Sequence, residues 1–494
     1  MSIPITASIL YNLVQCPHRV TMDLFGNPAK KDPTNPFIQL LWEKGNEFEL
    51  EVIESLNRPF TNLKAYSNEE KENLTIEAMK RGSDLIYGGR IRADDLIGEP
   101  DMLRRLNAKY IAGDIKSGAG EEGGGEDTDG KPKKHYAVQL ALYVDILERL
   151  GFSERRRPFI WDVHGKEIIY DLDVSQGARK TATLWDEYQA VLEVARNIVA
   201  RKESTLPAYA GICKLCHWFT ACKQTLEKLD DLTLIPELGR SKRDIMLACV
   251  KCRGDFASAE IMSFVQGKKT AFPGIGIDSL IKFQDRAILQ RKQGAKPYLK
   301  IPVTIPHYDR ELFFDVETDP MRDVCYLHGF IERLNGNNAS ERYIVFFAEE
   351  PTEEEEKRAF ELAWAYVNNC MPCMIYYYSA YERTIWSKLQ KKYPSIATAE
   401  EIESLFNSMK ATDLYHHIIR PRTEWPTYDH SIKTLASYLG FSWRDPNPSG
   451  AASIEWYHRW VKNRDPSVRQ RIMDYNEDDC RAMRVLLDEI RQMS

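Results

Sequence analysis

Two groups of carboxylates stand out as residues whose types and spacing could do chemistry. Near the C-terminus, the hexapeptide "YNEDDC" (475–480) places one phenol and three acids within five positions. Like charges packed so closely repel one another unless a cation lies among them. Two explanations are open: a solvated helix start, where acids suit the positive end of the helix dipole, and a bound divalent metal ion. The rest of the sequence must decide between them.

The segment "LFFDVETD" supplies two more acids, Asp315 and Glu317, where an apolar strand runs into them. Because side chains alternate along a strand, both carboxylates lie on one side of it and could face a pair of metal ions. Downstream, "MIYYYSAYERTIW" indicates a strand that leads to Glu382 at a helix start. In the hexapeptide, Tyr475 and Asp479 are one helical turn apart.

The segments "GEPDML" and "GDIKSG" form another constellation nearer the N-terminus. They place Asp101 and Asp114 on neighbouring strands, and each acid could end its strand, while Lys116 follows two residues after the second acid. Such acids hold Mg²⁺ or Mn²⁺ through oxygen ligands, and the lysine can orient or deprotonate water and stabilise charge near the scissile phosphate. Glu49, on an earlier helix, can bring a third carboxylate. By itself a D…DxK pattern is a weak signal, since turn and surface residues also produce it.

Four cysteines could hold a metal of another kind. Cys213, Cys216 and Cys222 lie in "CKLCHWFTAC" with C-x2-C-x5-C spacing, and Cys16 stands alone in "QCPHR". A four-thiolate zinc site is one explanation. The lone upstream cysteine and the five-residue gap favour an iron–sulfur cluster instead.

With these motifs in order, the first half of the chain resembles the RecB-type branch of the PD-(D/E)xK nucleases. It is similar in particular to the iron–sulfur members, which include the AddB nuclease domain and CRISPR-associated adaptation nucleases. Gln139 and Tyr143 in "QLALY" share one helix face and match the family's motif beside the site. The resemblance implies a catalytic Lys116, with Glu49, Asp101 and Asp114 as metal ligands and Cys16, Cys213, Cys216 and Cys222 as ligands of a [4Fe–4S] cluster. Such a cluster would staple the two ends of the domain together.

The second half resembles the RNase H-like DEDD 3′–5′ exonucleases, in their tyrosine-containing subgroup. Asp315 and Glu317 match the first motif, and Tyr475 and Asp479 match the Y-x3-D of the third. The second motif usually has Asp after an aromatic residue, whereas "AYE" supplies Glu382, as in a bacterial RNase H-like branch often joined to RecB-type nucleases. The resemblance implies two-metal phosphodiester hydrolysis in which Tyr475 orients the water.

This resemblance gives the hexapeptide a provisional interpretation. Asp479 is expected to be a metal ligand, and Glu477 and Asp478 are expected to flank it without binding metal. Asp413, in "ATDLYHHI", is expected to support the site or to cap a helix.

The elements that must position these residues divide the chain in the same way. Apolar spacing predicts helices over the first 55 residues, short strands with turns from 85 to 116, and a helix from 135 to 151. Small helices joined by tight turns are expected from about 231 to 300. Strand–helix alternation is expected from about 305 to the end.

A chain of 494 residues is too long for one hydrophobic core. We predict a RecB-like PD-(D/E)xK nuclease domain over 1–230, a helical, hairpin-rich basic linker over 231–304, and an RNase H-like DEDD exonuclease domain over 305–494. The expected fold class is α/β multidomain, with a restriction-endonuclease-like domain, a small helix–hairpin–helix-like linker and an RNase H-like domain. In this order the chain resembles a bacterial and archaeal family of RecB-like nucleases over nearly its full length.

Composition and charge set limits on the class of protein. With 43% hydrophobic and 28% charged residues, the chain is typical of globular proteins. No apolar run approaches the roughly 20 residues that span a bilayer, and the N-terminus lacks the basic region of a signal peptide, so we expect a cytoplasmic protein without a membrane partner. Ten cysteines in so long a chain do not form a disulfide framework, and clustered ones in a reducing compartment indicate metal binding.

The middle of the chain is basic. Between residues 236 and 300 there are 13 Lys and Arg against six Asp and Glu, a local +7 in a chain whose net charge is −6. This distribution fits a nucleic-acid grip, and a solvated basic surface is the alternative. "PGIG" (273–276) has the character of a helix–hairpin–helix turn, in which backbone N–H groups meet phosphate. A purely structural helical linker is the other explanation.

Together these features predict a metal-dependent DNA nuclease with two active sites that acts on single-stranded DNA or unwound ends. One alternative makes the RecB-like half a DNA-binding iron–sulfur scaffold that does not cleave. Another is a ribonuclease, because RNase H-like exonucleases accept either sugar. The sequence has no convincing Walker motif, so a helicase partner would be a separate protein.

Overall fold

The computed structural model of the chain describes residues 3–56, 58–123, 130–177 and 180–493. Backbone contacts divide it into two compact units. The first unit consists of Met1–Pro207 and Cys213–Cys222, and the second of Ala208–Ile212 and Lys223–Ser494. The domain boundaries expected after residues 230 and 304 stay predictions. Within the described ranges no helix has both the length and the apolar character needed to cross a membrane.

A mixed six-stranded sheet is at the centre of the first unit, in the order β11-β10-β7-β6-β3-β2. Its strands are β2 (Thr61–Asn62), β3 (Leu85–Tyr87), β6 (Met102–Leu106), β7 (Lys109–Ile115), β10 (Phe159–Trp161) and β11 (Glu167–Ile169). β6 and β7 form an antiparallel hairpin in which Met102 lies opposite Gly113. This register puts Asp101, which immediately precedes β6, beside Asp114 in β7. Asp101 therefore begins a strand, whereas the sequence pattern suggested that it could end one.

Shorter strands of the first unit form small separate sheets. These strands are β1 (Ile5–Thr6), β4 (Ile91–Ala93), β5 (Leu96–Gly98), β8 (Glu121–Glu122), β9 (Lys131–Pro132), β12 (Ser175–Gly177) and β13 (Lys180–Thr183). β1, β4 and β5 make one three-stranded sheet, and the others pair as β8 with β9 and β12 with β13.

Helices pack against both faces of the six-stranded sheet. They are α1 (Ala7–Gln15), α2 (Pro17–Phe25), α3 (Pro36–Ser55), α4 (Asn68–Arg81), α5 (Lys134–Arg149) and α6 (Leu184–Val199). Residues of β7 alternate between two apolar clusters: Tyr110 and Ala112 pack with α1, α5 and α6, whereas Ile111 and Ile115 pack with α3. Because Asp114 alternates in step with Tyr110 and Ala112, it faces the α5 side of the sheet.

The helices of this unit follow local signals in the sequence. α4 begins with a capping box between Ser67 and Glu70 and ends at Gly82, whose φ of +76° is a left-handed conformation that suits glycine. In α5, every residue from 137 to 147 except Gln139 is buried. A helix that is apolar nearly all round belongs in a core, so α5 is a fixed support for the polar side chains that it carries.

Small helices open the second unit. They are α7 (Phe219–Leu229), whose first residues group with the first unit, α8 (Gly239–Met246), α9 (Arg253–Ser258) and α10 (Ile277–Arg291), with the hairpin β14 (Val265–Gln266) and β15 (Lys269–Thr270). α8, α9 and α10 pack around an apolar cluster of their own, which includes Phe256 and Phe283. Glu237 in the loop before α8 and Gly239 at the start of α8 have left-handed conformations, and so does Gly274 in the loop before α10. We call residues 231–304 the helical linker.

A five-stranded mixed sheet is the core of the rest of the second unit, in the order β19-β18-β17-β20-β21. Its strands are β17 (Arg310–Asp319), β18 (Val324–Leu334), β19 (Asn337–Phe347), β20 (Met374–Tyr377) and β21 (Ala411–Asp413). β17 runs antiparallel to β18 and parallel to β20, so it is the central strand. The short strands β16 (Tyr298–Leu299) and β22 (Thr423–Glu424) form a separate pair.

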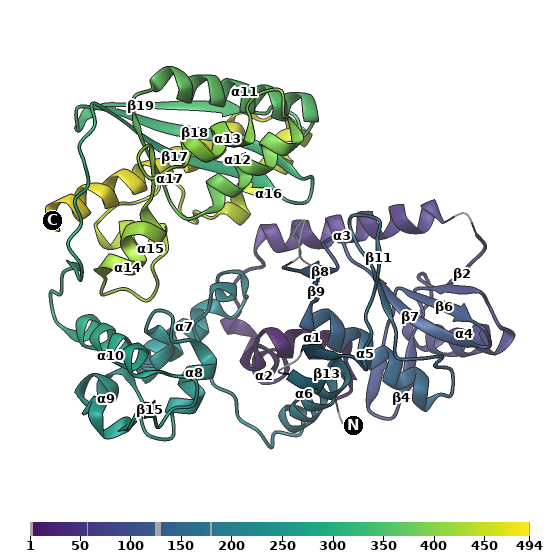
Figure 1. Cartoon of the computed structure of the whole chain (residues 1–494). Helices are drawn as coiled ribbons and strands as arrows, with labels where there is room; N and C mark the ends of the chain where they lie inside the picture. Colours follow the sequence, from purple (N-terminus) through teal and green to yellow (C-terminus); the bar gives the residue numbers. More distant parts are fainter. Residues whose placement is uncertain (1–2, 57, 124–129, 178–179, 494) are drawn as a thin grey trace. The chain divides into compact units, whose positions relative to one another are not determined.

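Helices cover both faces of this sheet, with α11 on one side and α17 on the other (Figure 1). They are α11 (Glu353–Cys370), α12 (Tyr381–Lys392), α13 (Ala399–Leu405), α14 (Arg420–Arg422), α15 (Ile432–Tyr438), α16 (Gly450–Asn463) and α17 (Pro466–Met493). Phe314 and Val316 of β17 pack with α11, α12 and α13, whereas Phe313 packs with α15 and α17. Because Asp315 and Glu317 alternate in step with Phe313, they face α17.

Candidate active sites

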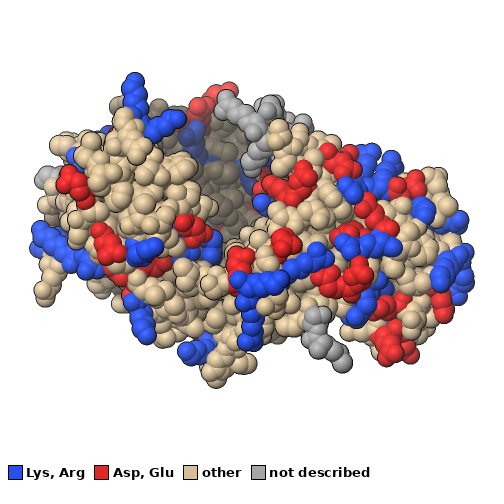
Figure 2. Space-filling model, turned by 90° about the horizontal axis from the view of Figure 1, so that it is seen from below, with Lys and Arg blue, Asp and Glu red and all other residues tan. Residues whose placement is uncertain are grey.

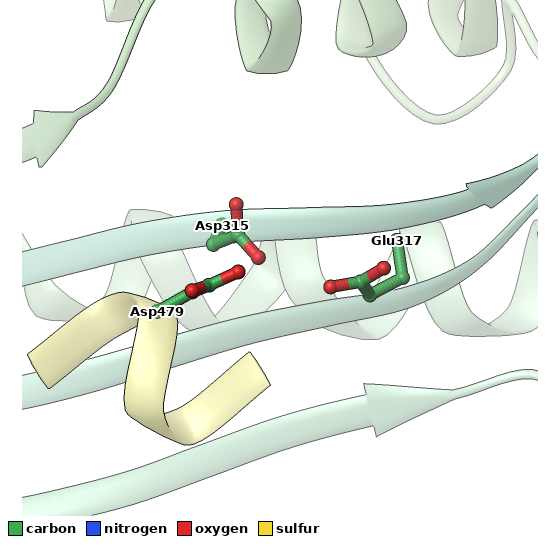
Figure 3. A group of neighbouring side chains, drawn as sticks. All are labelled: Asp315, Glu317 and Asp479. Atoms are coloured by element: carbon green, nitrogen blue, oxygen red, sulfur yellow. The ribbon is translucent and has the colours of Figure 1, made fainter. Parts of the chain in front are cut away.

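Three acids converge on the sheet of the second unit. Asp315 and Glu317 come from β17 and Asp479 comes from the middle of α17, and Figure 3 shows the three side chains close together. One ligand oxygen of each lies within 4.8 Å of the others. Within the described ranges this is the one group of at least three Asp, Glu, His or Cys side chains that converges so closely. The hexapeptide thus lies inside a long helix, and the helix-start explanation for its acids does not apply.

Burial and the repulsion between neighbouring carboxylates both make this cluster hard to ionise. Burial, followed by the neighbouring Asp479 carboxylate, raises the pKa of Asp315 well above its ordinary value. Burial and Asp315 raise the pKa of Glu317 in the same direction. Keeping these groups ionised is therefore costly unless a cation offsets their charge. Their donor atoms are all carboxylate oxygens, which Mg²⁺ and Mn²⁺ prefer, so the cluster fits a divalent metal.

Glu382 adds a fourth carboxylate from the first turn of α12. It is buried, and burial, followed by the charge of Asp315, raises its pKa well above the ordinary value. Its Oε2 atom is buried and has no hydrogen-bond partner among the described residues. Asp413 has a different place: its carboxylate accepts hydrogen bonds from the backbone N–H groups of Ser379 and His416 and caps the short helical turn after β21. Glu382 thus retains an oxygen that could bind a metal ion, whereas the Asp413 carboxylate stabilises the backbone through hydrogen bonds.

Two residues that the sequence did not single out contact the third motif. Lys433, in α15, places Nζ 2.8 Å from the Tyr475 hydroxyl and 3.2 and 3.3 Å from the two carboxylate oxygens of Asp479. The indole Nε1 of Trp443 donates a hydrogen bond of 2.7 Å to Asp479 Oδ1. Both residues lie more than 30 positions before Asp479 along the chain, so no short motif could have connected them with it.

The other residues of the hexapeptide have distinct partners. The side-chain amide of Asn476 donates a hydrogen bond of 2.7 Å to Asp315 Oδ2, which links α17 to β17. Glu477 and Asp478 pair with Arg444, at 2.8 and 2.9 Å respectively. Arg444 thus offsets the charge of two of the acids that the sequence places together, and they flank the cluster. Asn476 was within reach of sequence reasoning, because it lies next to Tyr475.

The acids of the first unit lie around the β6–β7 hairpin and converge less closely than those of the second unit. The backbone N–H of Ile115 donates a hydrogen bond of 2.8 Å to Asp101 Oδ2, and Lys116 Nζ lies 2.9 Å from Asp114 Oδ2. Burial and the charge of Asp114 raise the pKa of Asp101 to about 7. The structure therefore brings Asp101, Asp114 and Lys116 together, with a charge balance that a divalent cation would improve.

The remaining predicted residues of this unit lie around the same hairpin. Glu49, in α3, accepts a hydrogen bond of 2.9 Å from the Tyr87 hydroxyl and lies 2.6 Å from Lys64 Nζ. Its charge also contributes to the raised pKa of the nearby Asp101. On α5, Gln139 Nε2 lies 3.4 Å from the Tyr143 hydroxyl, so the two side chains do share a face. Tyr87 and Lys64 were not predicted, because their contact with α3 depends on tertiary packing.

The four cysteines of the proposed cluster all belong to the first unit. Cys16 separates α1 from α2, and the segment 213–222, with the other three, groups with this unit although its neighbours in the chain do not. Asp23 of α2 accepts a hydrogen bond of 2.8 Å from Trp218 Nε1, which ties the segment to the N-terminal helices. Burial raises the pKa of the Cys216 thiol, and Cys16 is near enough to contribute to that shift. This placement is compatible with shared ligation, and the iron–sulfur cluster stays a prediction.

Part of the positive charge of the helical linker is neutralised locally. Arg243 lies 2.8 Å from Asp231, and Arg253 lies 2.8 Å from Asp230. Asp230 and Asp231 lie a few residues before the segment with the excess of +7, and their charges offset part of that excess in the folded chain. On the face that Figure 2 shows, acidic and basic side chains lie interspersed. The count of charges along the sequence therefore overstates how basic this surface is.

Two comparisons with known families locate these sites within domains. A model of the PD-(D/E)XK nuclease superfamily matches residues 35–223, and a model of the RNase H superfamily matches residues 312–491. No curated protein matches the chain. The first match includes the β6–β7 hairpin and α5, and the second includes the whole acid cluster. Together with the two mixed sheets, these matches confirm the predicted α/β multidomain fold class and the predicted pairing of two nuclease-superfamily domains.

Proposed function

The chain joins a domain of the PD-(D/E)XK nuclease superfamily to a domain of the RNase H superfamily, and on this premise we propose that it is a metal-dependent DNA nuclease with two active sites. The observation that carries the proposal is the convergence of Asp315, Glu317 and Asp479 within the RNase H-superfamily domain. Divalent ions held by such carboxylates activate water and offset the charge of the phosphate that is cleaved.

In the RNase H-superfamily domain, we assign each side chain a separate task. Asp315, Glu317 and Asp479 hold Mg²⁺ or Mn²⁺, and Glu382 contributes its unsatisfied oxygen. Tyr475 orients the attacking water through its hydroxyl group, as expected for an exonuclease of the DEDD type. The fixed geometry of β17 and α17 supports this assignment, because rigid elements hold reacting groups better than loops.

In the PD-(D/E)XK domain, Asp101, Asp114 and Glu49 are the proposed metal ligands. Lys116 stabilises the charge that develops on the phosphate, a role supported by its position 2.9 Å from Asp114. Gln139 and Tyr143 line the α5 side of the same hairpin and orient the substrate or the acids. We propose that this site cuts a strand away from its end.

The proposed substrate is single-stranded DNA or an unwound end. The turns before α8 and α10 are proposed as helix–hairpin–helix contacts with the phosphate backbone, which position a strand without reading its sequence. Unwinding would be the task of a separate helicase partner. We expect the protein to act in the cytoplasm, where reduced thiolates are available to the cysteine segment.

The first prediction concerns metal and substrate. The full-length protein with Mn²⁺ or Mg²⁺ is expected to degrade labelled single-stranded DNA, and excess EDTA is expected to lower the rate at least about a thousandfold. The measurement is release of acid-soluble label, followed in parallel with DNA and RNA of the same sequence. Restoration by added Mn²⁺ is the control for irreversible damage. Degradation of RNA alone would overturn the DNA assignment in favour of a ribonuclease.

A second prediction concerns the cysteines. Protein purified without oxygen is expected to be brown, with broad visible absorption and about four iron atoms per chain. Cys216→Ser is expected to remove most of this absorption, whereas Cys249→Ser, at an exposed cysteine outside the proposed set, is expected to retain it. A colourless native protein that contains zinc by elemental analysis would replace the cluster with a four-thiolate zinc site.

A further inference from the structure

Lys433 contacts the acid cluster at the point where a metal ligand is expected. Its Nζ lies 3.3 Å from Oδ1 and 3.2 Å from Oδ2 of Asp479, and 2.8 Å from the Tyr475 hydroxyl. In the part of the chain that the structure describes, it is the one cationic side chain that pairs with Asp315, Glu317 or Asp479. Its side chain is 28% exposed, so the ammonium group lies at the boundary between the cluster and solvent.

The position of Lys433 follows from helix packing. Ser431 caps α15 by accepting a hydrogen bond from the backbone N–H of Thr434, and Asp429 in turn accepts a bond from Ser431. Leu435 of α15 packs in the same apolar cluster as the C-terminal half of α17. α15 is thereby fixed against α17, and Lys433, in its first turn, is held beside Asp479.

This arrangement gives the Asp479 carboxylate three contacts, from two side chains, before any metal binds. Both oxygens contact Lys433, and Oδ1 also accepts the hydrogen bond from Trp443. A divalent cation that uses Asp479 must share these oxygens with the ammonium group or displace it. Sharing brings two positive centres close together, and displacement breaks the ion pair between Lys433 and Asp479, so either event weakens metal binding.

We propose that Lys433 is a positioning residue that acts as an internal counter-ion: it holds Asp479 and Tyr475 in place and sets the metal concentration that the site requires. The inference rests on the proposed function, because it assumes that Asp479 is a metal ligand. The ammonium group donates to the phenol oxygen, so the Tyr475 hydroxyl keeps its own hydrogen for another acceptor. Removal of the charge makes the cluster more negative and releases this constraint.

The test is calorimetric titration of metal-free, full-length protein with Mn²⁺. It uses an Asp114→Asn background, so that a ligand of the other site is absent. Lys433→Gln, which keeps the stem and a hydrogen-bond donor, is expected to tighten Mn²⁺ binding about tenfold or more. Lys433→Arg, which keeps the charge, is expected to bind within about threefold of the native side chain. Lys462→Gln, at an exposed lysine of α16, is the matched control and is expected to leave the affinity unchanged.

The outcomes separate this inference from the proposed function. Unchanged or weaker Mn²⁺ binding in Lys433→Gln overturns the counter-ion role. Lys433→Arg that binds Mn²⁺ as tightly as Lys433→Gln overturns it as well. If the glutamine variant folds poorly, Lys433→Met takes its place in the same comparison. A third outcome is that Asp315→Asn leaves the Mn²⁺ binding of the native chain unchanged. The acid cluster would then not be a metal site, and the proposed function itself would fail.

Discussion

Replacing Asp315 with asparagine is expected to lower stepwise removal of nucleotides from single-stranded DNA ends at least about a thousandfold. Asparagine has the same shape, but it lacks the charge with which a carboxylate holds a divalent cation. The change removes one of the three acids whose oxygens lie within 4.8 Å of one another. The measurement is the ladder of shortened products from end-labelled DNA at saturating Mn²⁺.

Two measurements show whether the lower rate of Asp315→Asn comes from the lost carboxylate or from a disturbed fold. Glu477→Gln is the matched control, because Glu477 lies in the same hexapeptide but pairs with Arg444, and its rate is expected to stay within about threefold of the native rate. Burial and neighbouring acids raise the pKa of Asp315, so a neutral side chain there should not lower the melting temperature in EDTA. End digestion by Asp315→Asn at the native rate would exclude this acid cluster as the exonuclease site.

Asp114→Asn has the second large expected effect. The variant is best made in the Asp315→Asn chain, because any DNA cleavage that remains in that chain is assigned to the PD-(D/E)XK domain. There it is expected to lower that residual cleavage of DNA at least about a thousandfold, because Asp114 is both a proposed ligand and the ion-pair partner of Lys116. Circular single-stranded DNA is a suitable substrate, since it has no end from which an exonuclease could begin.

The matched control for this variant is Glu99→Gln. Glu99 lies two residues before Asp101 but pairs with Arg90 at the surface, so its replacement is expected to leave cleavage unchanged. If the Asp315→Asn chain has no residual cleavage, or if Asp114→Asn leaves it intact, the PD-(D/E)XK domain does not cut. It would then be a DNA-binding scaffold, and the RNase H-superfamily domain would be the only nuclease of the chain.

Residues whose placement depends on local periodicity were predictable from the sequence. The two-residue repeat of a strand puts Asp315 and Glu317 on one side of β17, and helical spacing puts Tyr475 one turn before Asp479. The same reasoning placed Glu382 at the start of α12. In each case the backbone geometry of a single element determines where the side chain points, so neighbouring sequence is sufficient.

Residues that reach the site through packing between elements were not predictable. The segment around Lys433 indicates a short amphipathic helix, but nothing in it specifies that α17 is its neighbour. Trp443 and Arg444 follow that helix in a loop, whose course depends on the packed structure. The position of Asp101 at the start of β6 was also missed, because a turn and a strand end have similar composition. Boundaries of short elements carry less sequence information than their interiors.

The two units cannot be separated at one point of the sequence. Residues 208–212 belong to the second unit, whereas residues 213–222 belong to the first. Between Pro207 and Lys223 the backbone passes from one unit to the other three times. Tyr209 is anchored in the second unit by a hydrogen bond of 2.7 Å from its hydroxyl to Asp429. No single cleavage of the chain therefore yields two complete units, because one fragment always contains a segment that belongs to the other unit. Along the sequence, the chain alternates between the two units before the second continues alone, so transfer of either unit into another protein would require the whole segment from Pro207 to Lys223 to accompany it.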